Sequence, residues 1–334
     1  MTVLVTTFLL SALLCGGYLR FARVRRFLDA PNERSSHSHP TPHGGGAAVL
    51  LAFIAGPLLA AQCYNSWDES FVVLAVAALL LMIVGVIDDL RGLSVRVRMA
   101  LYSLVCLWVA DTLLQSIFID SGASRLVLGL LVALVMLWSL NLYNFMDGID
   151  GIATGEALCV LTYATMITLY FALGSVAYPV ILLLACCAGF LVINWPQARA
   201  FMGDGGSGFL GLTFGVFVVT ETMLPIWSWL ILLGWFVTDA SLTITLRLFR
   251  KQKIEQAYSE HAYQHLNRAA GTVKTLLLVF AINTVWLLPL AALAAIFKDW
   301  GFGLLILAYL PLIIVQYCCG AGQTTRKLTL RKQT

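Results

Sequence analysis

Long apolar runs alternate with short polar connections along nearly the whole chain. A helix needs about 20 apolar residues to cross a bilayer, and most of the runs approach that length. The runs at 45–62 and 207–220 are the weakest of the set. The pattern predicts an all-α, polytopic membrane bundle of about eleven transmembrane helices. The apolar runs are 2–19, 45–62, 71–87, 99–117, 125–142, 155–173, 176–194, 207–220, 225–246, 273–296 and 302–320.

Composition supports the same class of protein. Hydrophobic residues make up 60% of the chain, charged residues only 11%, and the mean hydropathy is +0.87. A soluble domain carries about a quarter charged residues, so most of this chain avoids water. We expect one transmembrane domain over 1–334, and no cleaved signal peptide, because no basic stretch precedes the first apolar run. The eight cysteines lie mostly in apolar runs without Cys-x-x-Cys, which favours packing over disulfides.

The basic residues predict an orientation. With the N-terminus outside, 19 of the 21 Lys and Arg residues fall in the tail or beside four of the five inner connections, and only Arg125 and Lys298 fall outside. Because Lys and Arg concentrate on the cytoplasmic side, this predicts a periplasmic N-terminus and a cytoplasmic C-terminus. The net charge of +4 then reflects topology and attraction to membrane lipids, and needs no nucleic-acid partner. The inner connections are 20–44, 88–98, 143–154, 195–206 and 247–274.

Two adjacent acids, Asp88 and Asp89, end the third apolar run. An Asp near lipid costs about 2.5–3.5 kcal/mol at mid-helix, so acids at this boundary need a compensating cation. The two carboxylates cannot share one helix face, so one can meet a metal while the other holds an Arg. The alternative is a helix end that frays into water, with Arg91 as the partner.

A second polar segment is Asn-Leu-Tyr-Asn-Phe-Met-Asp-Gly-Ile-Asp-Gly at 141–151. Asn144, Asp147 and Asp150 are spaced by three, and we expect them to share one face of an extending helix. The glycines at 148 and 151 allow sharp turns. Oxygen ligands at a membrane edge suit Mg²⁺, which completes its shell with water and phosphate. An ordinary loop is the alternative.

A glycine-rich segment, 194–208, lies before the run at 207–220. Such a turn at the start of a helix presents free N–H groups and a positive dipole end to an anion. Asp204 lies among four glycines, where it could hold a metal that bridges phosphates. Phe201 could stack on a base or could simply lie at the membrane interface.

Two further polar segments contain histidines. His261 and His265 are four apart and share a face if the stretch is helical. A phosphate or sugar contact is the favoured interpretation and a Zn²⁺ site the alternative. The Pro and Gly residues of the segment 34–46 predict a rigid, non-helical lead into the second run. Its His and Arg residues could contact phosphates or could simply lie in water.

Taken together and in order, the five segments resemble the polyprenyl-phosphate N-acetylhexosamine-1-phosphate transferase family, glycosyltransferase family 4. The resemblance covers nearly the whole chain, and it implies a single transmembrane catalytic domain over 1–334 in a bacterial inner membrane, with the active site facing the cytoplasm. It is strongest to the transferases that initiate O-antigen synthesis, because His-Ala-Tyr-Gln at 261–264 replaces the triple-His signature of the peptidoglycan enzymes. The segment departs from those relatives at Tyr258-Ser259, where they tend to have His-Arg, and the amino sugar therefore stays open.

The resemblance implies a role for each site residue. Asp88 and Asp89 match acids near the lipid phosphate, and Asn144 and Asp204 match ligands of Mg²⁺, with Mn²⁺ as an alternative. Asp239, inside the run at 225–246, matches an acid that we interpret as structural. The other implied catalytic residues are Asp147 and His261, and the implied nucleotide-sugar contacts are Asp150, Asn194, Phe201, Arg98 and His265.

The implied reaction is Mg²⁺-dependent transfer of a sugar-1-phosphate from a UDP-N-acetylhexosamine to undecaprenyl phosphate, with release of UMP. Its product would initiate a lipid-linked glycan such as O-antigen. A homodimer is an open alternative to a monomer. The rival class is a multi-span transporter of an anionic or lipid-linked substrate, but no internal repeat suggests two related halves. A membrane scaffold would have no reason to place Asn, Asp and His at five inner connections.

Overall fold

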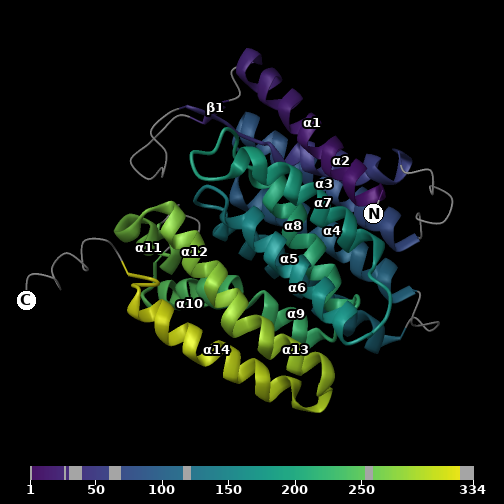
Figure 1. Cartoon of the computed structure of the whole chain (residues 1–334), viewed down its shortest axis with the longest axis vertical. Helices are drawn as coiled ribbons and strands as arrows, with labels where there is room; N and C mark the ends of the chain where they lie inside the picture. Colours follow the sequence, from purple (N-terminus) through teal and green to yellow (C-terminus); the bar gives the residue numbers. More distant parts are fainter. Residues whose placement is uncertain are drawn as a thin grey trace, which may run out of the picture.

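The structure is a bundle of helices packed side by side (Figure 1). It is a computed structural model that describes residues 2–25, 28–29, 40–59, 69–115, 122–252 and 259–323. The only strands in these ranges are β1 (Leu28–Asp29) and β2 (Thr41–Pro42), which pair antiparallel. The α-helices are α1 (Thr2–Arg25), α2 (Gly46–Leu59), α3 (Glu69–Arg91), α4 (Val95–Gln115), α5 (Ala123–Met146), α6 (Ile152–Tyr170), α7 (Tyr178–Asn194), α8 (Asp204–Val219), α9 (Ile226–Leu232), α10 (Gly234–Phe249), α11 (Ala262–Ala270), α12 (Thr272–Ile282), α13 (Leu288–Ile296) and α14 (Gly301–Cys318). A π-helical stretch, η1 (Asn283–Leu287), joins α12 to α13, and a 3₁₀ turn, η2 (Lys298–Trp300), precedes α14.

The prediction of an all-helical, multi-pass membrane bundle is confirmed. Within the described residues, seven helical segments are long and apolar enough to cross a bilayer, and the bent pair of α9 and α10 makes an eighth if it counts as one span. Three shorter apolar helices, α2, α7 and α8, coincide with three other predicted runs. The count of eleven crossings and the orientation of the termini stay predictions.

The sequence suggested one straight helix over the run at 225–246, but the structure shows two helices there. The run bends by 73° between α9 and α10. Side chains of α14 satisfy the backbone at the bend: Tyr309 Oη donates to the carbonyl of Leu230 at 2.6 Å, and Gln316 Nε2 donates to that of Trp235 at 3.1 Å. Backbone groups freed by a broken helix must find such partners inside a membrane protein. The bend therefore depends on α14, which the local sequence of α9 and α10 does not reveal.

Helix α8 lies in the middle of the bundle and is buried over nearly its whole length. Its first turn touches neighbouring backbones through glycine. A Cβ on Gly85 of α3 would lie 2.5 Å from Gly205 Cα, and one on Gly46 of α2 would lie 2.3 Å from Gly206 Cα. Small residues allow such close backbone approach in membrane bundles. The packing fixes the start of α8, and with it the backbone of Asp204.

Candidate active site

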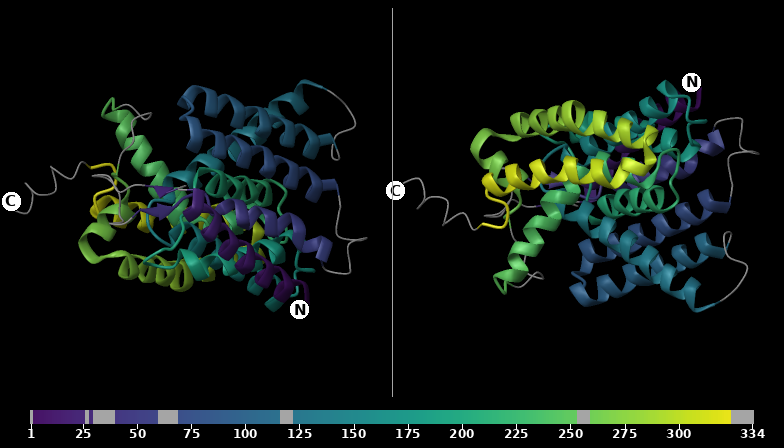
Figure 2. Two further views of the ribbon diagram at one scale, coloured as in Figure 1. Left: turned by 90° about the horizontal axis from the view of Figure 1, so that it is seen from above. Right: turned by 90° about the horizontal axis from the view of Figure 1, so that it is seen from below.

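The polar segments meet at one end of the bundle. In Figure 1, β1 and α11 lie at this end, and the start of α1 lies toward the other. Figure 2 shows from two further sides that the N-terminus lies toward the opposite end of the bundle from α11. Hydrogen bonds and ion pairs connect all five segments here, and they are described in turn below.

An arginine bridges two acids from different helices. Arg98 Nη1 lies 2.6 Å from Asp88 Oδ2 and 2.9 Å from Asp204 Oδ2. Asp88 Oδ1 also accepts a hydrogen bond from the Leu93 backbone N–H at 2.7 Å. The partner of Asp88 is thus Arg98 of α4, and Arg91 is exposed. Asp89 lies in the last turn of α3, and its side chain is outside the described part of the structure.

The prediction that Asn144, Asp147 and Asp150 share one helix face is wrong. Helix α5 ends at Met146, and Asp147 already has non-helical backbone angles. Gly151 has φ of 75°, a conformation that suits glycine, and α6 begins at the next residue. The acids of this segment therefore lie on a turn between two helices, and they can approach the other loops independently.

Asn144 and Asp147 face the start of α8. Asn144 Nδ2 donates to Ser207 Oγ at 3.1 Å, and Ser207 Oγ in turn reaches the backbone oxygens of Gly203 and Asp204. The pKa of the Asp147 carboxyl is raised to about 8, mainly by burial; His43 opposes this shift, and the Asp204 and Asp150 carboxylates contribute to it. The acids of two segments therefore share one electrostatic environment.

Asp150 anchors the connection that follows α7. Its Oδ2 accepts from the backbone N–H groups of Gln197 at 3.1 Å and Ala198 at 3.0 Å. Its Oδ1 is buried and has no hydrogen-bond partner among the described residues. Asn194, the buried last residue of α7, uses both amide atoms: it accepts from Thr154 Oγ1 at 2.8 Å and donates to the Ala200 carbonyl at 3.0 Å. Asn194 thus shapes this loop, while Asp150 retains one acceptor.

The glycine-rich loop pairs with the segment that leads into α2. The N–H groups of Gly45 and Gly46 donate at 2.8 Å to the carbonyls of Phe201 and Met202. This places His43 over the loop, since a Cβ on Gly203 would lie 3.2 Å from His43 Nε2. The prediction of a non-helical lead is confirmed for residues 40–45, but His43 was not singled out as a site residue. Its sequence signal was only membership of the His-rich segment.

His261 caps the start of α11 and is held by a buried acid. Asp239 accepts from the backbone N–H groups of Ala262 at 2.9 Å and Tyr263 at 3.1 Å, and its Oδ1 lies 3.5 Å from His261 Nδ1. Tyr263 Oη donates to the carbonyl of Phe145 at 3.0 Å. Asp239 thus joins the histidine segment to α10, and Tyr263 joins it to the end of α5. A bond between residues 118 positions apart has no signal in the local sequence.

His265 does not join the acidic groups. Its ring is bonded to the Gln323 carbonyl at 3.1 Å and to Arg268 Nη2 at 2.9 Å. Burial, and then Arg268, lower the pKa of the ring. The Gly322 N–H also donates to the Glu260 carbonyl at 2.7 Å. His265 therefore faces the segment after α14 and not the same direction as His261.

Whether the site could bind a metal ion depends on the side chains that could act as its ligands. The described residues contain no group of three or more His, Cys, Asp or Glu side chains that could hold a metal. Asp204 and Asn144 nevertheless supply two oxygen-bearing side chains, connected through Ser207. Mg²⁺ suits such a sparse set, because it retains several waters and binds substrate phosphates. A structural Zn²⁺ site, which takes four protein ligands, does not fit these residues.

Comparison with known proteins points to one family. Residues 71–222 match the family model of glycosyl transferase family 4. The chain is similar to the probable undecaprenyl-phosphate N-acetylglucosaminyl 1-phosphate transferase of Bacillus subtilis strain 168, at 29% identity over 72% of this chain and 69% of that protein. It is also similar to the undecaprenyl-phosphate alpha-N-acetylglucosaminyl 1-phosphate transferase of Thermotoga maritima, at 26% identity over 80% and 81%. A third relative, the phospho-N-acetylmuramoyl-pentapeptide-transferase of Rubrobacter xylanophilus, is 26% identical over 80% and 88%.

Proposed function

Because the chain belongs to glycosyl transferase family 4, we propose that it transfers an N-acetylhexosamine-1-phosphate from a UDP-sugar to undecaprenyl phosphate. Two similar proteins are named as N-acetylglucosaminyl 1-phosphate transferases, and the third is named for a different amino sugar. That difference supports the reaction class and leaves the sugar of this chain open. The proposed product starts a lipid-linked glycan such as O-antigen.

One observation carries the proposal. Arg98 bridges Asp88 and Asp204 at the end of the bundle where Asn144, Asp147 and His43 also gather. This concentration of charge lies at the ends of apolar helices, where a water-borne diphosphate could reach a phosphate carried by a lipid. The distribution of Lys and Arg supports a cytoplasmic site in the bacterial inner membrane.

The reaction requires an in-line displacement at phosphorus. An oxygen of the polyprenyl phosphate attacks the β-phosphorus of the UDP-sugar, and the bond from that phosphorus to the bridging oxygen breaks. UMP leaves, and a polyprenyl-diphospho-sugar stays in the membrane. Such transfers depend on positioning and on neutralised charge more than on covalent chemistry by the protein.

The side chains of the site divide these tasks. Asp204 and Asn144 would hold Mg²⁺, which would supply charge neutralisation at the diphosphate. Arg98 can turn from the two acids toward phosphate oxygens, and Asp88 or Asp89 would position or deprotonate the acceptor. Oδ1 of Asp150 and the ring of Phe201 would contact the nucleoside of the donor. His261 would contact the sugar end.

The test is Asp204→Asn in membranes supplied with labelled UDP-N-acetylhexosamine and undecaprenyl phosphate. We expect transfer of label to lipid to fall at least about 100-fold, since one charged contact to a developing phosphoryl charge has that value. The matched control is Asp299→Asn, which removes an acid from the short turn before α14 and should leave transfer unchanged.

The outcome that would discard the assignment is transfer by Asp204→Asn at the level of the control. Release of UMP that needs both Mg²⁺ and the polyprenyl phosphate separates this enzyme from a transporter. A panel of UDP-GlcNAc, UDP-GalNAc and UDP-linked 6-deoxy amino sugars, scored for lipid-linked product, then identifies the donor.

A further inference from the structure

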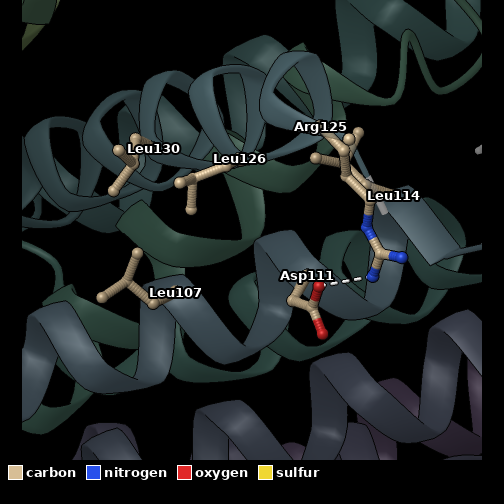
Figure 3. Close-up of a pocket in the computed structure, with 8 residues that line it drawn as sticks. Leu107, Asp111, Leu114, Arg125, Leu126 and Leu130 are labelled. Carbon is tan, nitrogen blue, oxygen red and sulfur yellow. Dashed lines mark hydrogen bonds and ion pairs between the residues drawn. The ribbon is translucent and has the colours of Figure 1, made fainter. Parts of the chain in front are cut away.

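A groove lies between α4 and α5, away from the candidate active site. Its volume is about 320 Å³, within the range of small-molecule sites. Figure 3 shows Leu107 of α4 across from Leu126 and Leu130 of α5, with Asp111 and Arg125 at one end of the groove. The full lining is Leu107, Asp111, Leu114, Gly122, Arg125, Leu126, Gly129 and Leu130.

The two charges at the end of the groove form an ion pair with unequal exposure. Arg125 Nη2 lies 2.5 Å from Asp111 Oδ1, and Gln115 Nε2 donates to Asp111 Oδ2 at 2.8 Å. The Asp111 side chain is 58% exposed, whereas that of Arg125 is only 18% exposed. A molecule that approaches from the bilayer surface therefore meets the carboxylate first and the guanidinium second.

The position of the pair in its helices fits the headgroup level of a membrane. Asp111 lies one turn before the end of α4, and Arg125 lies in the first turn of α5. Trp108, one turn from Asp111, is 41% exposed, and exposed Trp is typical of the membrane–water interface. The leucines at 107, 126 and 130 continue from this level into the apolar part of the bundle and are themselves exposed.

We propose that this groove binds a zwitterionic phospholipid whose headgroup carries a primary ammonium, with one acyl chain along the leucines. The ammonium donates to Asp111, and the lipid phosphate lies beside Arg125. The pair is neutral overall and shows its carboxylate outward, so it complements such a headgroup better than a purely anionic one. The site does not rest on the proposed reaction, because thirteen residues of helix, about 20 Å, separate Asp111 from Arg98.

The test is native mass spectrometry of the full chain in detergent, mixed with phosphatidylethanolamine, phosphatidylcholine and phosphatidylglycerol of identical acyl chains. In the variant Gly129→Leu the groove is blocked, so any lipid that still binds to this variant binds elsewhere on the protein. A Cβ at Gly129 meets its nearest atom, Leu114 Cδ1, at an ordinary 3.5 Å, so the backbone there accepts a side chain, and a leucine at this lining position would occupy the groove. The lipid binding that the wild type shows and Gly129→Leu lacks is assigned to the groove. We expect this binding to favour phosphatidylethanolamine over phosphatidylglycerol by about fivefold in affinity, the value of one exposed ion pair.

Asp111→Asn should abolish that preference, and Asp299→Asn, an acid outside the groove, should keep it. Equal adducts in the wild type and Gly129→Leu would refute a lipid site here, as would a preference for phosphatidylglycerol. If Gly129→Leu instead abolished a dimer, the groove would be a surface between copies of this chain. Preferential displacement of the adduct by undecaprenyl phosphate would assign the groove to the tail of the acceptor, again against the proposal.

Discussion

Replacing Arg98 tests whether Asp88 and Asp204 require a positive charge between them. The structure places one nitrogen of Arg98 at 2.6 Å from Asp88 and 2.9 Å from Asp204. Arg98→Met keeps an apolar stem and removes the charge. Because both carboxylate oxygens bond the same nitrogen, they lie at most about 5.5 Å apart, and their repulsion is about 3 kcal/mol at an effective dielectric constant near 20.

Water reduces that repulsion. The side chains of Asp88 and Asp204 are 11% and 31% exposed, so part of the interaction is screened. We expect Arg98→Met to lose about 1–2 kcal/mol of folded stability, which lowers the unfolding midpoint by several degrees. Transfer should fall about 100-fold, or about 2.7 kcal/mol of transition-state stabilisation.

Arg98→Lys is the matched variant. Both ion pairs use a single guanidinium nitrogen, so one ammonium can replace it, and we expect transfer within about tenfold of wild type. The assays are transfer of label to lipid and thermal unfolding of the same preparations. Full activity in Arg98→Met, or equal loss in the Met and Lys variants, would show that charge between the two acids is not what the site requires.

Three further changes test the surroundings of the site. Tyr263→Phe removes the bond to the Phe145 carbonyl, and we expect about 1 kcal/mol lower stability and about tenfold lower kcat with KM unchanged, measured by unfolding and steady-state kinetics. Asn194→Ala leaves the Ala200 carbonyl without its donor, so unfolding should show a loss of about 1–3 kcal/mol, and no loss would contradict the buried bond. The raised pKa of Asp147 means that the folded chain holds a proton that the unfolded chain releases above about pH 4, so stability of the metal-free protein should fall from pH 4 to pH 8. Asp147→Asn should flatten that slope, and an unchanged slope would assign it to another group.

The sequence predicted the helices well because lipid imposes a simple rule on them. Apolar length and composition predicted most of the helical segments, and the polar residues between them predicted side chains that the structure brings together at one end of the bundle. The glycine-rich turn before Asp204 was also predicted, because Gly203 and the first turn of α8 follow local chemistry.

The remaining features depend on contacts between distant parts of the chain. Arg98 lies 106 residues from Asp204, and nothing local to either one predicts their ion pair. The bend between α9 and α10 depends on Tyr309 and Gln316 of α14. The expected helix face at 144–150 failed because glycine turns ended α5 earlier than the spacing of its polar residues suggested.

The glycine contacts at the start of α8 have a consequence for how the site could adapt to new substrates. Main-chain atoms of three helices touch there, so a substitution at Gly46, Gly85 or Gly205 can only add bulk to a place that has no room. The backbone at this part of the site is thereby fixed. Changes in donor preference would have to arise elsewhere, for example in α11, where the Tyr263 side chain meets the end of α5.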